Sequence, residues 1–186
     1  KLENLPQPFS VKIDMNIQQV LEAVGDNDIT CILLEPIQSS SGDIHHKTEF
    51  FRELHELASL HNIPVIHDEI QIGFGGTGRL WHFEHLGLEP DLVVFGKKTQ
   101  LSGIMVKEEF GDIFSKTKRT KLEVTWDADV SDMIRCKYII KAYKKYDILQ
   151  NVNERSIELV DKLSKVNNVY NLRSKGLIVG FDLPYT

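Results

Sequence analysis

Short apolar runs alternate with amphipathic segments along the first part of the chain. The apolar runs are rich in Val, Ile and Leu and cover residues 30–34, 63–66, 92–95 and 101–106. Between them, apolar side chains three or four positions apart predict helices over residues 14–24 and 48–60, with Thr48 placed to cap the second. Apolar runs of this length are typical of buried strands, and strands that alternate with helices form parallel sheets. The pattern therefore predicts an α/β fold, a mostly parallel sheet with flanking helices.

The pattern changes after residue 130. Helical spacing predicts two consecutive helices, over residues 131–146 and 151–163, and an apolar run predicts a last strand over residues 176–182. We therefore expect a domain boundary near residue 130. It would separate part of a large domain, residues 1–130, from part of a small α+β domain, residues 131–186.

Composition and charge exclude several classes of function. The chain of 186 residues is 41% hydrophobic and 26% charged, which is ordinary for a globular protein. Its net charge of −5 provides no basic surface for nucleic acid, and no apolar run approaches the length of a membrane span. Cys31 and Cys136 are far apart in the sequence and are expected to be reduced thiols, which favours a cytoplasmic location.

Polar side chains follow three of the predicted strands. Glu35 ends the first run, Asp68 follows the run at 63–66, and Lys97 and Lys98 follow the run at 92–95. Ligands bind at the carboxyl ends of the strands in open α/β sheets, so Asp68 and Lys98 are expected to face one pocket. A lysine that forms a Schiff base and an acid that pairs with a pyridinium nitrogen are what a pyridoxal phosphate site requires.

Two other motifs point weakly to different chemistry. The glycines of residues 73–78 have the spacing of a dinucleotide fingerprint, but acids separate them from the preceding strand and only a short helix, near residues 81–86, follows. His82 and His85 could share a helix face as metal ligands, but no third ligand has a recognisable spacing. We therefore expect neither a nicotinamide or flavin site nor a metal site.

Taken together, the motifs resemble those of the class III aminotransferases of pyridoxal phosphate fold type I. The matching strings are Leu-Glu-Pro-Ile-Gln at 34–38, the segment from His67 to Trp81, the segment from Pro90 to Gln100, Thr-Trp at 125–126, and Arg-Ser-Lys-Gly-Leu at 173–177. Their order and spacing are similar to the family over nearly the whole chain. The string Phe-Gly-Lys-Lys-Thr-Gln at 95–100 resembles the lysine 6-aminotransferase (lysine ε-aminotransferase) branch, although the 4-aminobutyrate branch also has a lysine pair there.

The resemblance implies how the cofactor would be held. Lys98 would be the Schiff-base lysine and the proton shuttle, preferred to Lys97 because the family lysine aligns with the residue nearer Ser102. Asp68 would pair with the pyridine nitrogen of pyridoxal phosphate. Gln71 would lie beside the phenolic oxygen of the ring.

It also implies roles at the edges of the site. Glu35 would lie at the substrate pocket, as a gate or as a partner for the substrate-binding arginine. Arg173 would bind the α-carboxylate of the substrate. Thr125 would reach across a homodimer interface to the cofactor phosphate of the partner.

The implied reaction is transfer of the ε-amino group of L-lysine to 2-oxoglutarate by a ping-pong mechanism. Two alternatives remain: another class III ω-aminotransferase, acting on ornithine or 4-aminobutyrate, and a non-catalytic remnant of such an enzyme. The chain departs from the family at Asp127 and Ala128, which replace two glycines, and at Ser39, where the family has glycine. The N-terminal half of the family has no counterpart in the chain. We therefore expect a fragment that is inactive on its own.

Overall fold

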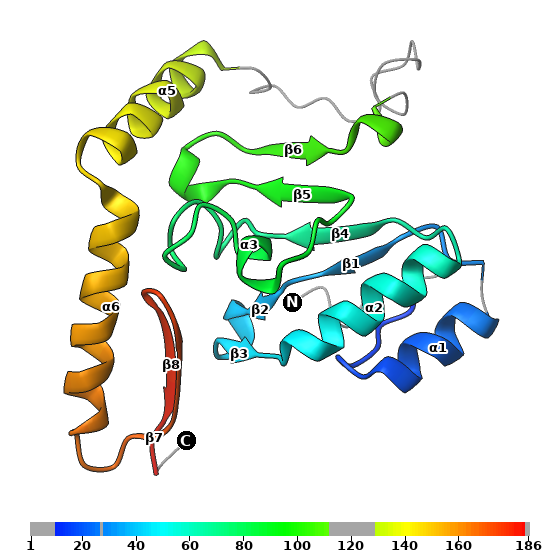
Figure 1. Cartoon of the computed structure of the whole chain (residues 1–186), viewed down its shortest axis with the longest axis horizontal. Coiled ribbons are helices and arrows are strands. Elements are labelled where there is room, and N and C mark those ends of the chain that lie inside the picture. Colours follow the sequence, from blue (N-terminus) through cyan, green and yellow to red (C-terminus); the bar gives the residue numbers. More distant parts are fainter. Residues whose placement is uncertain (1–9, 27, 112–128, 185–186) are drawn as a thin grey trace.

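A four-stranded sheet forms the centre of the computed structural model, which describes residues 10–26, 28–111 and 129–184 (Figure 1). Its strands, in spatial order, are β1 (Ile32–Leu34), β4 (Val65–Asp68), β5 (Leu92–Phe95) and β6 (Gly103–Val106). β4 is parallel to β1 and to β5, whereas β6 runs antiparallel to β5. The expected α/β architecture with a mostly parallel sheet is therefore confirmed.

Helices α1 (Ile17–Asp26) and α2 (Thr48–Leu60) pack on one face of this sheet. The core that they enclose consists of buried apolar side chains: Val20, Leu34, Phe51, Leu54, Leu57, Ala58, Ile63, Val65 and Leu86. α2 covers the predicted range, but Thr48 is its first residue and not its cap. Lys47 occupies the N-cap position, and no side chain accepts a hydrogen bond there.

Short elements connect the strands at their carboxyl ends. A small hairpin, β2 (Ile37–Gln38) and β3 (Ile44–His45), follows β1 and encloses a 3₁₀ turn, η2 (Ser39–Ser41). A one-turn helix, α3 (Phe83–Leu86), lies between β4 and β5. The 3₁₀ turns η3 (Lys97–Thr99) and η4 (Glu108–Phe110) follow β5 and β6. The hairpin is too short to be recognised from a strand pattern, and it was not predicted.

The last part of the chain contains two long helices and a hairpin. These are α5 (Val130–Lys145), α6 (Ile148–Ser164), β7 (Tyr170–Lys175) and β8 (Ile178–Asp182). α6 runs alongside the antiparallel β7–β8 hairpin (Figure 1). Both helices and β8 were predicted, but β7 was not. The prediction of a domain boundary at residue 130 stays a prediction, and none of the helices that the structure describes is long and apolar enough to cross a membrane.

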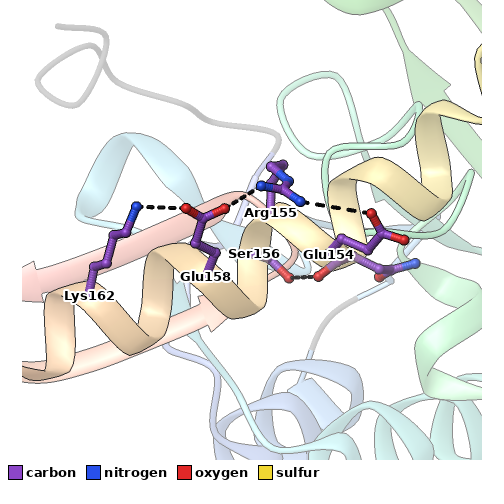
Figure 2. A network of polar contacts seen from close by, with 6 residues as sticks. Glu154, Arg155, Ser156, Glu158 and Lys162 are labelled. Carbon is purple, nitrogen blue, oxygen red and sulfur yellow. Dashed lines mark hydrogen bonds and ion pairs between the residues drawn. The ribbon is translucent and has the colours of Figure 1, made fainter.

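The solvent-facing side of α6 holds a chain of ion pairs (Figure 2). Arg155 contacts Glu158 and lies 3.9 Å from Glu154, and the Lys162 ammonium lies 2.6 Å from Glu158. Charges three or four positions apart meet on one helix face and support the helix. The opposite, inward side of α6 is therefore the side available for packing, and Val152 is buried there.

Candidate functional site

Asp68 and Lys98 come from neighbouring parallel strands. Asp68 is the last residue of β4, where it pairs in register with Val94 of β5, and Lys98 lies in η3 directly after β5. Both side chains therefore start at the carboxyl edge of the sheet, where ligands of α/β folds bind. The Oδ1 atom of Asp68 accepts a hydrogen bond of 3.0 Å from the backbone N–H of Ile70. This bond fixes the carboxylate beside the segment that leaves β4.

The two lysines of η3 contact that same segment. The ammonium of Lys98 donates to the carbonyl oxygens of Gln71 and of Gly73, the latter at 3.2 Å. The ammonium of Lys97 donates to the side-chain Oε1 of Gln71. Lys98 is half-buried, whereas Lys97 and Gln71 are exposed. The structure thus brings together Lys98 and Gln71, two of the residues predicted from sequence.

The surroundings of Lys98 favour its neutral amine. Burial, and then the neighbouring positive charge of Lys97, lower the pKa of Lys98, and Glu69 opposes this shift. A desolvated lysine next to a second cation is an activated nucleophile. The turn itself has unusual geometry, because Lys97 and Gln100 have φ angles of 51° and 55°. Left-handed conformations at residues other than glycine occur often at functional sites.

Glu69 is a buried acid beside the site that the sequence reasoning did not assign. Only 1% of its surface is exposed, and its carboxylate accepts hydrogen bonds from the backbone N–H groups of His82 (2.7 Å) and Phe83 (2.9 Å). Burial raises the pKa of Glu69 to about 7, although both N–H donors act in the opposite direction. Glu69 therefore connects the end of β4 to the start of α3. Its position directly after Asp68, at the end of a predicted strand, is the feature of the sequence from which Glu69 could have been assigned to the site.

The glycine-rich segment 73–78 packs against the C-terminal elements. The hydroxyl of Tyr143, on α5, donates to the carbonyl of Phe74 at 2.8 Å. The amide of Asn153, on α6, donates to the carbonyl of Gly78 at 3.0 Å. A Cβ atom at Gly78 would lie 2.0 Å from the Asn153 side chain. These glycines allow close approach of two helices, which accounts for them without a dinucleotide.

The turn between β7 and β8 also contacts this segment. The backbone N–H of Leu177 donates to the carbonyl of Gly76 at 2.9 Å. Gly176 has a φ of +59°, and a Cβ atom there would lie 2.4 Å from the backbone of Thr77. Position 176 must therefore be a glycine for the β7–β8 hairpin to pack against the segment that contacts Lys98.

Arg173 and Glu35 share no contact with Lys98 within the described residues. Arg173, on β7, donates to the carbonyls of Gly42 (2.6 Å) and Asp43 (3.0 Å) and forms an ion pair of 3.1 Å with Asp182. Glu35 is exposed after β1 and is not among the ion-pair partners of Arg173 in the described residues. Thr125 lies outside the described residues.

The groups at the carboxyl edge fit the chemistry of pyridoxal phosphate. A lysine amine of lowered pKa suits the aldehyde carbon, and a fixed carboxylate on the neighbouring strand suits a protonated ring nitrogen. Among the residues that the structure describes, no group of three or more His, Cys, Asp and Glu side chains is placed to share a metal ion.

Comparison with known proteins agrees with this chemistry. The family model of Aminotransferase class-III matches residues 5–186. The L-lysine-epsilon aminotransferase of Amycolatopsis lactamdurans is 36% identical over 168 residues, which are 87% of this chain and 37% of that enzyme. The mitochondrial 4-aminobutyrate aminotransferase of Homo sapiens is 33% identical over 160 residues, which are 82% of this chain and 31% of that enzyme.

Solved structures show the same likeness. The lysine aminotransferase from M. tuberculosis, solved in the internal aldimine form, superposes with a TM-score of 0.83 at 30% identity and covers 90% of this chain and 41% of that one. The ornithine delta-aminotransferase of Plasmodium falciparum has the same fold, with a TM-score of 0.80 at 21% identity over 91% of this chain and 45% of that one. The chain thus spans less than half the length of the proteins it matches.

Proposed function

Because this chain belongs to the class III aminotransferases, a family of pyridoxal phosphate enzymes, we propose that the protein transfers the ε-amino group of L-lysine to 2-oxoglutarate by a ping-pong mechanism. The observation that supports this most directly is the half-buried amine of Lys98 at the carboxyl end of β5, next to the segment that begins with Asp68. The similarity to lysine-epsilon aminotransferases supports the choice of donor.

Each residue at the carboxyl edge has a distinct task in this proposal. Lys98 would hold the cofactor through its amine and, once the substrate amine has replaced it, would move a proton at the reacting carbon of the substrate. The lowered pKa of Lys98 serves the first task, because an amine must be neutral to act as a nucleophile. The bound cofactor supplies a ring that accepts the electrons left when that carbon loses its proton.

Asp68 and Gln71 set the electronic state of the cofactor. The carboxylate of Asp68 would favour a protonated ring nitrogen in the bound cofactor, because a nearby negative charge stabilises a cation. The side chain of Gln71, now bonded to Lys97, would lie beside the phenolic oxygen. The fixed position of Asp68, bonded to the N–H of Ile70, keeps the carboxylate in place while charge moves through the ring.

Recognition of the substrate would rest on Arg173 and Glu35. A guanidinium binds a carboxylate through two parallel hydrogen bonds, so Arg173 would bind the α-carboxylate after it exchanges the ion pair with Asp182. Glu35 would act as the gate or the partner of that arginine. Thr125 would contact the cofactor phosphate of the partner subunit in a homodimer located in the cytoplasm.

Competing donors test the proposal. We expect the intact protein that would contain this chain, purified and loaded with pyridoxal phosphate, to convert L-lysine and 2-oxoglutarate faster than L-ornithine or 4-aminobutyrate, with glutamate as the product. The relation to 4-aminobutyrate aminotransferases makes that substrate the second candidate. Faster turnover of 4-aminobutyrate, which has no α-carboxylate beside an amine, would contradict both the donor and the role of Arg173. No turnover with any donor would favour the non-catalytic remnant.

A further inference from the structure

A hollow lined by other residues than those assigned above lies against the β2–β3 hairpin. It has a volume of about 130 Å³ and is enclosed by the hairpin, the first turn of α2, α3 and β7. Its polar lining consists of four histidines, two hydroxyl residues and a lysine: His45, His46, His82, His85, Thr48, Ser174 and Lys175. We call it the histidine pocket. Asp68, Gln71, Lys98 and Arg173 do not line it.

Two ring nitrogens in this lining have no hydrogen-bond partner. The Nδ1 atom of His82 and the Nε2 atom of His45 are buried and unbonded within the described structure, and the whole His82 side chain is 5% exposed. By contrast, His85 is 3.0 Å from the carbonyl of Thr77, and His46 is 3.2 Å from Gln38. A buried polar atom without a partner is destabilising, and a turn of either ring toward the hollow would let a bound ligand satisfy the nitrogen that is now hidden from solvent.

Lys175 is the charged side chain in the lining and is positive, whereas the carboxylates of Asp43 and Glu84 act on His45 and His85 from outside the lining. Lys175 is half-buried, and within the described residues its side-chain ammonium forms no hydrogen bond or ion pair. No aspartate or glutamate lines the hollow. The pocket also meets the start of α2 at Thr48, where no side chain caps the free N–H groups and the helix dipole is positive. The acid of that first turn, Glu49, is exposed and is not part of the lining.

The histidines can serve as neutral donors. Burial is the main cause that lowers the pKa of His45, His46 and His85, and it lowers the pKa of His82 to about 3. A neutral imidazole presents one N–H donor and one acceptor, and the tautomer adapts to the ligand. Neutral rings could also bind a metal, but the ammonium of Lys175 disfavours a cation, and the described side chains form no cluster of three metal ligands.

We propose that the histidine pocket binds a small oxyanion, a sulfate, phosphate or carboxylate group. Lys175 would supply the charge, His45 and His82 the hydrogen bonds, and the uncapped turn of α2 the backbone N–H groups. Helix N-termini that combine with a cation and side-chain donors are established anion-binding arrangements. The inference does not depend on the amino-transfer reaction, since the pocket shares no lining residue with that site.

Binding of sulfate tests the proposal, with histidine labelled by ¹⁵N and chloride keeping the ionic strength constant. We expect saturable changes in the imidazole signals of His45 and His82. Lys175→Met should weaken binding by at least about tenfold, the size expected for loss of a charge-assisted hydrogen bond. Lys137→Met, which removes an exposed lysine of α5, should leave it unchanged. Lys175→Arg, which keeps the charge, should restore most of the affinity.

Parallel titrations with acetate distinguish the source of the anion. Tighter binding of acetate would assign the pocket to a carboxylate, and tighter binding of sulfate or phosphate would assign it to a tetrahedral anion. Three results would overturn the inference: no saturable change, equal affinity in Lys175→Met and the unchanged protein, or signals that respond to Zn²⁺ and not to anions. His45→Gln is a second variant, with a smaller expected loss, should Lys175→Met lower the unfolding midpoint.

Discussion

Replacing Asp68 with asparagine separates the charge of this side chain from its shape. The Oδ1 atom of Asp68 accepts one hydrogen bond, from the N–H of Ile70 at 3.0 Å. The amide oxygen of asparagine can accept the same bond in the same position. The variant should therefore fold normally and lack only the negative charge that the proposed mechanism places beside the ring nitrogen of the cofactor.

The expected effects on stability and on rate differ in size. A retained hydrogen bond limits the loss in the free energy of unfolding to about 1 kcal/mol or less. Loss of the negative charge should raise the barrier by at least ~3 kcal/mol, which is roughly a hundredfold in rate. Both are measured in the intact protein that would contain this chain: urea denaturation gives the first quantity, and steady-state turnover of lysine with 2-oxoglutarate gives the second. Cofactor content, followed by absorbance, shows whether the rate falls in fully loaded protein.

Asp91→Asn is the matched control. Asp91 precedes β5 at the edge of the sheet opposite Lys98, where it accepts a hydrogen bond from the N–H of Val65 (2.8 Å) and pairs with Lys107 (2.8 Å). Its replacement should cost about 1 kcal/mol of stability and leave the rate of loaded protein unchanged. Near-normal turnover in Asp68→Asn, or an equal rate loss in both variants, would refute the assigned role.

Three further predictions concern the packing around the site. Gly176→Ala, with a Cβ atom 2.4 Å from the backbone of Thr77 at a φ of +59°, should lower the free energy of unfolding by about 3 kcal/mol in urea, and wild-type stability would contradict the observed hairpin packing. Tyr143→Phe should lower it by about 1 kcal/mol through loss of the bond to Phe74, and no loss would mean that the contact contributes nothing. Burial lowers the pKa of His67 from 6.5 to about 3, so the unfolded chain binds a proton between these values and stability falls as the pH drops through them. As the pH falls through this range, the free energy of unfolding of His67→Phe should therefore decrease by up to about 1.4 kcal/mol less per pH unit than that of the unchanged protein. Parallel pH profiles of the two proteins would contradict the reasoning.

The elements with strong local patterns were predictable from the sequence. The range of α2 was predicted exactly because its apolar face repeats at helical spacing and is buried against the sheet. β5 was also predicted from a local pattern, because it is a short apolar segment bounded by polar residues. Asp68 and Lys98 followed from these strands, because the end of a parallel strand determines which edge a side chain occupies.

The missed features depend on contacts between distant segments. β7 has mostly exposed or half-buried residues and no apolar run, so only its pairing with β8 makes it a strand. Tyr143 bonds to a residue 69 positions earlier in the chain, and Asn153 bonds to one 75 positions earlier, both in the glycine-rich segment. The histidine pocket likewise combines four elements. Local spacing contains no information about such contacts, so the glycines 73–78 resembled a nucleotide motif.

The identity of the lysine that binds the cofactor tests the central claim most directly. Borohydride reduction of the intact protein that would contain this chain, loaded with pyridoxal phosphate, fixes the cofactor on its lysine, and mass spectrometry of the peptides locates it. Lys98 should carry the pyridoxyl group, because its half-buried amine has the lowered pKa, whereas Lys97 is exposed. A pyridoxyl group on Lys97, or on neither lysine, would contradict the account.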